Sequence, residues 1–479
     1  MVALAGGDPL TLAWSKLARM GMRAKKKGRI SSMKKFSILL ILALLATFIV
    51  APGASAQGIT WTSGFQVQNL GSSTANIVIK YYNQDGSQPI ADVSDSVPAM
   101  SSKTYYPIHT ADGFNGSVVV EGDQPIVAIA NTLGNNPQYA ASTESFAAGA
   151  TKIGLPLIMR GNSGYYTWFN VQNAGSGDAS VTVQYIPGSS GSAHTEAPVT
   201  IKPGAARTFD QRGLGALGTQ FVGSAVITSD QPIVATVMQV GETFKNMMGY
   251  NGFIGGSTEV SLPLVMANNS GFYTGIQVQN VGASSTSITI KYGSNLGGSF
   301  APGDDTATLA AGESQTFLQA GGAWTGNTYI GSATITTGGE DVVAIVNQVK
   351  LTGTALGTAY NGFDPGKATS KVSAPLIMAN NSGYYTGVQV MNVGSSATTV
   401  TGTYGPNIAG SYAPPAETAT LQPGDSVTWI QNSGAWTGNK YVGSMSVSAS
   451  GGGEIVLIAN QIWPAAAGDQ FMTYDGFNY

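Results

Sequence analysis

Hydrophobic and polar residues alternate along the chain after residue 56, in short runs that glycine-rich turns separate. Phe65-Gln66-Val67-Gln68 and Ile276-Gln277-Val278-Gln279 are two such runs. A period of two residues is typical of a β-strand with one buried face. No sustained helical period follows residue 56. The pattern therefore predicts a protein built from half-buried strands.

The alternating runs belong to a block that is repeated four times. Each copy contains Val-Gln-Asn or Val-Met-Asn, at Val67-Gln68-Asn69, Val171-Gln172-Asn173, Val278-Gln279-Asn280 and Val390-Met391-Asn392. Successive copies are 104, 107 and 112 residues apart, which is the size of a domain. About six to eight short strands fit each block, so the repeat predicts one β-sandwich per block.

A second motif occurs only three times. It reads Pro-Leu-hydrophobic-Met before an Asn-Ser-Gly turn, at Pro156-Leu157-Ile158-Met159, Pro263-Leu264-Val265-Met266 and Pro375-Leu376-Ile377-Met378. If this motif is a strand that leads each sandwich, block one lacks it; if it closes the preceding sandwich, block four lacks it. In either frame two interpretations stay open: a strand from another molecule completes the open domain, or the terminal domain is simply a smaller sandwich.

Turn chemistry separates the remaining strands. Pro203-Gly204 and Pro423-Gly424 suit type II turns. Block three has Gly312 at the glycine position of this turn, and block one has Pro98-Ala99, which suits a type II turn less well. Blocks two to four end on Tyr250-Asn251-Gly252-Phe253, Tyr360-Asn361-Gly362-Phe363 and Tyr474-Asp475-Gly476-Phe477. Asn-Gly and Asp-Gly favour tight turns, so we expect the two aromatic residues to pack across a bend.

These motifs together resemble tandem immunoglobulin-like repeats of bacterial secreted and cell-surface proteins, including subunits of extracellular filaments. The resemblance covers residues 58–479. It implies an all-β fold of four immunoglobulin-like β-sandwich domains in an elongated array. The expected divisions are 1–56 for an N-terminal extension and signal peptide, 57–149 for repeat one without its leading strand, 150–255 for repeat two, 256–367 for repeat three and 368–479 for repeat four.

The N-terminal segment has the pattern of a secretory signal peptide. Lys34 and Lys35 precede the apolar run Ile38 to Val50, and the small residues Ala54-Ser55-Ala56 follow before Gln57. We therefore expect cleavage between Ala56 and Gln57, and Met33 is a plausible start. The mature protein is predicted to be extracellular or attached to the cell surface.

Composition narrows the classes of partner. Cysteine is absent, and only 10% of residues are charged. Removal of residues 1–56 leaves 13 basic and 24 acidic residues, a net charge of −11. A thinly charged acidic surface argues against nucleic-acid binding, which needs basic side chains to neutralise phosphates. No second apolar segment approaches about 18 residues, so no membrane span is expected in the mature chain.

The inventory of catalytic groups is small. His109 and His194 are the only histidines, they lie in different blocks, and no recognised nucleophile, phosphate-binding or zinc motif occurs. Asp304 and Asp305 are adjacent rather than interleaved as in a calcium-binding loop, which favours a solvated turn. The sequence predicts no enzyme, no cofactor and no metal site.

Aromatic residues provide the candidate contact sites. They follow the Asn-Ser-Gly turns or lie in a shared Ala-Trp-Thr-Gly-Asn stretch: Tyr165, Tyr166, Trp168, Phe272, Tyr273, Trp324, Tyr384, Tyr385 and Trp436. The favoured interpretation is packing in a core or an interdomain seam, and the alternatives are stacking on glycans or contact between subunits. Asn115, Asn268 and Asn380 begin Asn-x-Ser sequons and are candidate glycosylation sites.

Two functions follow from these observations, in order of preference. The first is a secreted structural subunit that self-assembles into an extracellular filament or surface layer by β-strand addition, with other copies as its partners. The second is a monomeric adhesin or glycan-binding stalk, and a hydrolase with an unrecognised site is a distant third. Near-identical stretches in blocks three and four suggest that length is selected, as in a rod of four sandwiches.

Overall fold

The described part of the protein consists of strands and short 3-10 turns. The computed structural model describes residues 59–135, 138–350 and 352–479, which belong to the compact unit Gly58–Tyr479. Within these residues there is no α-helix, and the 3-10 turns are η1 (Gly215–Leu217), η2 (Gly322–Trp324), η3 (Pro365–Lys367), η4 (Gly434–Trp436) and η5 (Ser450–Gly452). The all-β prediction is confirmed. The predicted signal peptide lies outside the described residues.

Blocks three and four share one order of eight strands, which we number as positions one to eight. In block three these are β17 (Glu259–Ala267), β18 (Tyr273–Asn280), β19 (Thr286–Tyr292), β20 (Asp305–Leu309), β21 (Ser314–Leu318), β22 (Tyr329–Thr337), β23 (Val342–Lys350) and β24 (Leu356–Asn361). In block four they are β25 (Lys371–Ala379), β26 (Tyr385–Asn392), β27 (Thr398–Tyr404), β28 (Glu417–Leu421), β29 (Ser426–Ile430), β30 (Tyr441–Ala449), β31 (Ile455–Ile462) and β32 (Phe471–Asp475), followed by the short β33 (Phe477–Asn478).

Blocks one and two are variants of this order. Block two has β8 (Ala150–Arg160), β9 (Tyr165–Asn173), β10 (Ala179–Ser190), β12 (Val199–Ile201), β13 (Ala206–Asp210), β14 (Phe221–Gly241) over positions six and seven, and β15 (Asn246–Asn251), with short β11 (His194–Thr195) and β16 (Phe253–Ile254). In block one the described strands start at position two, with β1 (Trp61–Asn69), β2 (Ala75–Asn83), β3 (Val93–Val97), β4 (Ser102–Tyr105), β5 (Gly116–Gly122), β6 (Ile126–Gly134) and β7 (Tyr139–Glu144).

Blocks three and four are sandwiches of two antiparallel sheets, whereas in block two the long strand β14 joins the two layers into one nine-stranded sheet. In block three the orders are β21-β18-β23-β24 and β17-β22-β19-β20, and the core between them includes Ile276, Val278, Ile335 and Val346, all fully buried. Positions two and five pair, as do three and six, like strands B–E and C–F of immunoglobulin domains. Position one, however, joins position six, and position seven joins position two. The strand order therefore differs from the ABED and CFG sheets of a constant-type immunoglobulin domain.

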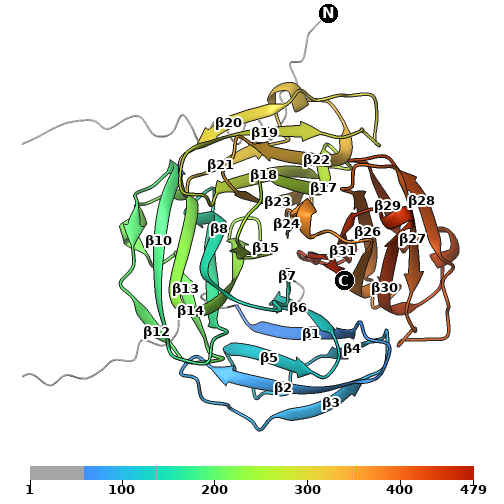
Figure 1. Cartoon of the computed structure of the whole chain (residues 1–479), viewed down its shortest axis with the longest axis horizontal. Coiled ribbons are helices and arrows are strands. Elements are labelled where there is room, and N and C mark those ends of the chain that lie inside the picture. The colour runs from blue at the N-terminus through green and yellow to red at the C-terminus, as the bar shows by residue number, and fades with distance from the viewer. Residues whose placement is uncertain (1–58, 136–137, 351) are drawn as a thin grey trace, which may run out of the picture. The chain divides into compact units, whose positions relative to one another are not determined.

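The four blocks close a ring, so the expected elongated array is wrong. The position-eight strands contact one another in a cycle, β7 with β15, β15 with β24, β24 with β32 and β32 with β7 (Figure 1). An elongated array would leave block four away from block one. Polar groups on these strands explain the closure, because they find hydrogen-bond partners in the neighbouring block.

Four residues at the ends of the position-eight strands form an axial ring: Glu144, Asn251, Asn361 and Asp475. The backbone N–H of Asn251 donates to the side-chain oxygen of Asn361 at 3.1 Å. In the same way Asn361 N–H donates to the Asp475 carboxylate at 3.2 Å, and Asp475 N–H donates to the Glu144 carboxylate at 2.7 Å. Asn251 Nδ2 completes the cycle by donating to the Glu144 carbonyl at 2.9 Å. Each block thus contributes one residue at an equivalent position.

A buried aspartate ties the blocks together at the other ends of these strands. Asp469 is 0% exposed, and its carboxylate accepts hydrogen bonds from the N–H groups of Met247 in block two and Gly357 in block three. Its own N–H donates to the Gln138 carbonyl of block one at 3.1 Å. Burial raises the pKa of Asp469 well above its usual range. This residue contacts all three other blocks.

The seams between blocks bury amide side chains that alternation alone assigned to solvent. Gln66 Nε2 donates to the Pro375 carbonyl at 2.6 Å, and Ser373 Oγ donates to Gln68 Oε1 at 2.7 Å. Gln66 and Gln68 are 1% and 0% exposed. The position-two strand of block one is therefore buried on both faces, because the position-one strand of block four covers its polar side.

The predicted type II turns have the expected backbone, with one correction. Gly204, Gly312 and Gly424 have φ values of 75°, 79° and 80°. In block one Met100, rather than Ala99, takes this place with φ 53°, because the turn closes from Ser101 N–H to the Pro98 carbonyl. The alignment of Pro98 with Pro203 is thus wrong by one residue.

Candidate strand-accepting site

Among the residues that the structure describes, block one has no strand paired with β5 at the place of position one. In blocks two to four the position-one strand pairs with position six of its own block, as β8–β14, β17–β22 and β25–β30. The corresponding sheet of block one is β3-β2-β5 and ends at β5. The Pro-Leu-hydrophobic-Met strand thus leads each block that has it. We call the position beside β5 the vacant slot.

One wall of the vacant slot is the apolar interior of block one. Five residues on β5 and β6 face it and are half-buried: Val118, Val120, Ile126, Ala128 and Ala130. Their counterparts in block three are at most 1% exposed: Ala333, Ile335, Val342, Ala344 and Val346. The two sets occupy the same register positions. Without a described strand beside β5, these core side chains are more exposed than their counterparts in block three.

The opposite wall belongs to β9 of block two. Its outward side chains Asn170 and Gln172 are half-buried. The equivalent Gln277 and Gln279 of block three are 2% and 0% exposed, because the position-one strand of the preceding block covers that side. Both walls are thus uncovered at the same seam, between blocks one and two. The exposure of side chains on β5 and β6 in block one and on β9 in block two thus locates the vacant slot independently.

The other seams show what an occupant of the slot would bond. At two seams a glutamine donates to the carbonyl of the proline in the Pro-Leu-hydrophobic-Met motif. Gln66 Nε2 donates to Pro375 at 2.6 Å, and Gln389 Nε2 donates to Pro263 at 3.2 Å. Asn170 occupies the equivalent position, since it accepts from Thr208 as Gln389 accepts from Thr428. An entering strand would therefore meet an amide donor at its proline and apolar side chains along its inner face.

Block one also differs at position eight, where the other blocks hold a tyrosine. Tyr250, Tyr360 and Tyr474 are at most 1% exposed and donate from their hydroxyls to the carbonyls of leucines in the position-one strands, at 2.7, 2.7 and 2.6 Å. The expectation that this tyrosine simply packs across the bend missed that hydrogen bond. Block one has Thr143 there, which suits a block without its own position-one strand.

A spacing in the sequence marks where the missing strand would fall. Pro156, Pro263 and Pro375 each precede the Asn of Val-Gln-Asn or Val-Met-Asn by 17 residues, and Pro52 precedes Asn69 by the same 17. The position of the absent strand therefore coincides with the end of the predicted signal peptide. Both Pro52 and the predicted cleavage site at Ala56 and Gln57 lie outside the described residues.

The two tryptophans considered for glycan stacking are in block cores. Trp324 and Trp436 are 8% and 3% exposed. Trp324 packs edge-on against Tyr292, with ring centroids 4.9 Å apart, and Trp436 packs in the same way against Tyr404. Neither ring is available to a sugar, so that role is excluded for both residues. The core interpretation is the correct one here.

Three of the remaining candidate aromatics contact other aromatic rings at seams or near them. Trp168 lies 6.2 Å from Trp61 of block one, and Phe272 lies 5.3 Å from Phe471 of block four, measured between ring centroids. Tyr384 lies 5.6 Å from Trp463 of its own block. The first two contacts join neighbouring blocks, whereas the third lies within block four.

The last four candidates are partly or fully covered. Tyr165 is 9% exposed and donates its hydroxyl to Asn246 Oδ1 at 3.0 Å. Tyr166, Tyr273 and Tyr385 are half-buried, and the Arg212 guanidinium lies 5.3 Å from the Tyr166 ring centre. Contact of these residues with glycans or other subunits stays a prediction.

The candidate sequon residues are on the surface. Asn115, Asn268 and Asn380 are exposed, and the last two share a left-handed backbone with φ 48°. Asn380 Nδ2 donates to the Asn439 carbonyl at 2.9 Å. Their exposure is compatible with modification, and glycosylation stays a prediction.

The histidines and the adjacent aspartates have ordinary structural surroundings. His109 Nδ1 lies 3.1 Å from the Tyr81 hydroxyl, and the His194 ring stacks on Tyr185. Asp305 accepts a hydrogen bond from the Tyr292 hydroxyl at 2.6 Å. Within the described ranges, no three His, Cys, Asp or Glu side chains gather as a metal-binding group. No helix in these ranges is long and apolar enough to cross a bilayer.

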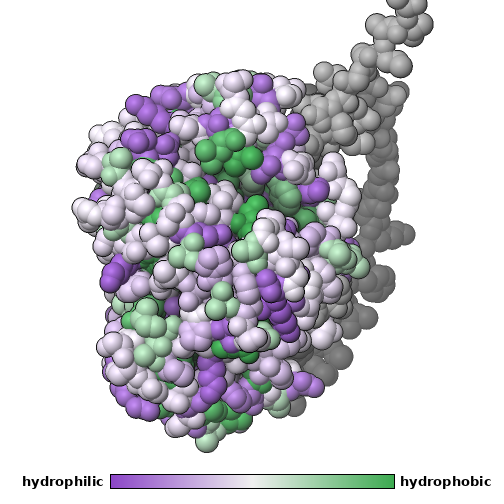
Figure 2. Space-filling view, turned by 90° about the vertical axis from the view of Figure 1, so that its right-hand side faces the viewer, coloured by the Kyte–Doolittle hydropathy of each residue, from purple (hydrophilic) through white to green (hydrophobic). Residues whose placement is uncertain are grey.

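The vacant slot differs from the apolar residues scattered over the surface. Figure 2 shows the face at the right of Figure 1, where hydrophobic residues form separate patches among hydrophilic and neutral ones. Isolated exposed residues such as Ile408 and Ile430 in block four, 50% and 46% exposed, are normal on soluble domains. The vacant slot instead exposes residues whose counterparts form cores.

Comparison of the sequence with models of protein families found no match, and comparison with curated proteins found none either.

Proposed function

We propose that the mature chain is a secreted structural subunit that self-assembles by β-strand addition at the vacant slot. The observation that carries this proposal is the half-exposed row on β5 and β6, whose counterparts in block three are fully buried. Strand addition satisfies such an edge, because main-chain hydrogen bonds provide affinity and alternate side chains fill the exposed core. The resemblance to immunoglobulin-like filament subunits supports the same class of function.

The occupant that we propose is a strand of a second copy of this chain. The low density of charge supports close packing of copies, because closely apposed subunits would repel one another little. Pairing of two β5 edges would be self-complementary and would stop at a dimer. A different strand as donor would leave each copy with one donor and one acceptor, and assembly would continue into a filament or layer.

Removal of the leader fits this proposal. A chain that begins at Gln57 has no residues at the spacing of the position-one strand, so its slot stays open to another copy. A chain that begins at Thr47 keeps Pro52 and the residues around it, which have the spacing needed to fill the slot from within. We expect the first chain to assemble and the second to assemble less or not at all.

The test changes one side chain in the slot and one on the same strand. Val120→Lys places a charge in the slot, whereas Val119→Lys places the same charge on the opposite face of β5. Negative-stain microscopy and light scattering of secreted protein should show assemblies for the wild type and Val119→Lys, and single molecules for Val120→Lys. Wild-type protein that stays monomeric at all concentrations would refute self-assembly. Equal assembly of both variants would refute the slot as its site.

The glycan-binding stalk has less support. A stalk of this kind would require an elongated array of domains and exposed tryptophans. The blocks instead close a ring, and Trp324 and Trp436 are buried.

A further inference from the structure

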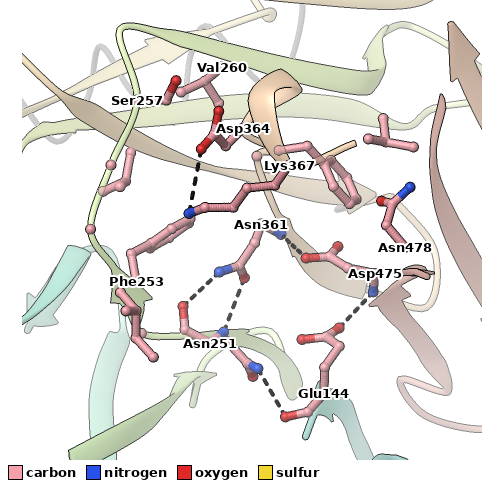
Figure 3. A pocket seen from close by; sticks show the side chains of 18 of the residues that line it. Glu144, Asn251, Phe253, Ser257, Val260, Asn361, Asp364, Lys367, Asp475 and Asn478 are labelled. Carbon is pink, nitrogen blue, oxygen red and sulfur yellow. Dashed lines mark hydrogen bonds and ion pairs between the residues drawn. The ribbon is translucent and has the colours of Figure 1, made fainter. Parts of the chain in front are cut away.

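An open cavity lies at the axial ring. Its volume is about 330 Å³, and its lining includes all four residues of the axial ring (Figure 3). Every block therefore contributes to one site. A cavity of this size can receive a small organic molecule, since ligand pockets begin at roughly 300 Å³.

Phenylalanine rings surround the polar residues of this cavity. Each block places one two residues after its axial-ring residue: Phe146, Phe253, Phe363 and Phe477. All four are half-buried and line the cavity. The sequence suggested only that the aromatic residues of the Tyr-Asn-Gly-Phe motif pack locally. Ring closure brings the four phenylalanines to one place.

Two oxygens in the axial ring lack hydrogen-bond partners among the described residues. They are Asn251 Oδ1 and Asp475 Oδ1, and both atoms are shielded from solvent. Asn251 is 7% exposed and lines the cavity. A buried acceptor without a donor is costly, so the axial ring is short of hydrogen-bond donors.

The lining of the cavity is rich in carboxyl groups. Glu144, Asp475 and Asp364 contribute carboxyl groups. Among the described lining residues Lys367 alone is cationic, and it pairs with Asp364 at 3.4 Å. Burial raises the pKa of Glu144 to about 7, and burial together with the neighbouring Glu144 raises the pKa of Asp475 well above its usual range. Burial is the main cause of both shifts, and only the shift of Asp475 also reflects the neighbouring carboxyl group.

We propose that this axial cavity binds an organic ammonium ion, with its charge against the Glu144 and Asp475 carboxyl groups and its carbon atoms against the four phenylalanines. Aromatic rings attract cations through their negative faces and also bury apolar substituents. A bare divalent cation fits less well, because calcium takes six to eight oxygen ligands and the aromatic walls supply none. This inference does not depend on self-assembly.

The experiment uses benzyltrimethylammonium as the probe and isothermal titration of the mature protein at pH 8. We expect one site per chain with a Kd below about 1 mM, and at least about fivefold weaker binding of uncharged benzyl alcohol. Glu144→Gln should weaken binding of the ammonium about tenfold, and the double variant with Asp475→Asn should weaken it further. Lys367→Gln should strengthen binding two- to fivefold, because it removes a competing positive charge.

Protonation gives a second readout on the unmodified protein. Binding of the permanently charged probe should weaken as the pH falls from 8 to 5, because Glu144, whose pKa is about 7, then binds a proton. Equal affinity for benzyl alcohol, or an affinity that Glu144→Gln leaves unchanged, would overturn the proposal. Calcium chloride binding at this site in the absence of any ammonium binding would overturn it as well. Thermal unfolding of each variant would confirm that it remains folded.

Discussion

Block one and block three contain the same strands from position two to position eight, yet they differ in how well their cores are closed. In block three Ile335 and Val346 are fully buried, whereas Val120 and Ala130 in the same register of block one are half-buried. The difference is the position-one strand, which covers the side of the core between the two sheets. A single edge strand therefore decides whether this sandwich is closed or open.

The same strand also governs the seams of the ring. Where it is present, it buries the amide side chains of the following block, as with Gln277 and Gln279. Where it is absent, Asn170 and Gln172 remain half-buried. Closure of each core and of each seam thus depends on one element, which explains why its loss opens both walls of the vacant slot.

The largest expected effect comes from shortening one isoleucine in two blocks. Ile126 begins the position-seven strand of block one and is half-buried. Ile455 begins the same strand of block four and is 0% exposed. Ile455→Ala should lower the free energy of unfolding by about 3 kcal/mol, because it creates a cavity in a closed core. Ile126→Ala should cost about 1 kcal/mol, because solvent already reaches that site. Urea denaturation would measure both, and equal losses would contradict the difference in closure.

A smaller effect is expected in the axial ring, where blocks one and four place carboxyl groups and blocks two and three place amides. The pKa of Glu144 rises from its usual 4.5 to about 7 in the folded protein. The folded state therefore holds a proton that the unfolded state has lost between these values, and stability falls as the pH rises through this range. Glu144→Gln should raise the free energy of unfolding by about 2 kcal/mol at pH 8 and by much less at pH 4. Urea midpoints at both pH values would test this, and an equal effect at both would contradict the assigned pKa.

The smallest effect concerns the turn before position five. Met100 in block one adopts φ 53°, a left-handed conformation that Gly204 occupies in block two. Met100→Gly should raise the free energy of unfolding by about 0.5–1 kcal/mol, because glycine adopts this backbone without steric cost. Gly204→Ala should destabilise by more than about 1 kcal/mol, since its methyl group would lie 2.8 Å from the Tyr82 ring. Thermal melting of the two variants gives the comparison, and a loss of stability in Met100→Gly would count against it.

The sequence predicted the strands of each block well, because their alternation reports the buried inner face directly. The count of Pro-Leu-hydrophobic-Met motifs also pointed to an open terminal block. Ring closure was beyond this reasoning, since Gln66 and Gln68 look like exposed residues until a strand from a block 300 residues away covers them. The axial ring was missed for the same reason, because Glu144 and Asp475 meet only after closure.

The measurement that tests the vacant slot most directly is binding of a peptide with the sequence of residues 371–380, which contains the position-one strand of block four. Fluorescence anisotropy with the chain that begins at Gln57 should show saturable binding of one peptide per copy, with a Kd of about 1–100 μM. Binding should be lost in Val120→Lys, retained in Val119→Lys and lost when Ile377 in the peptide is replaced by Asp. Absence of binding to the wild-type chain, or binding that Val120→Lys leaves unchanged, would contradict the central claim that block one accepts a strand beside β5.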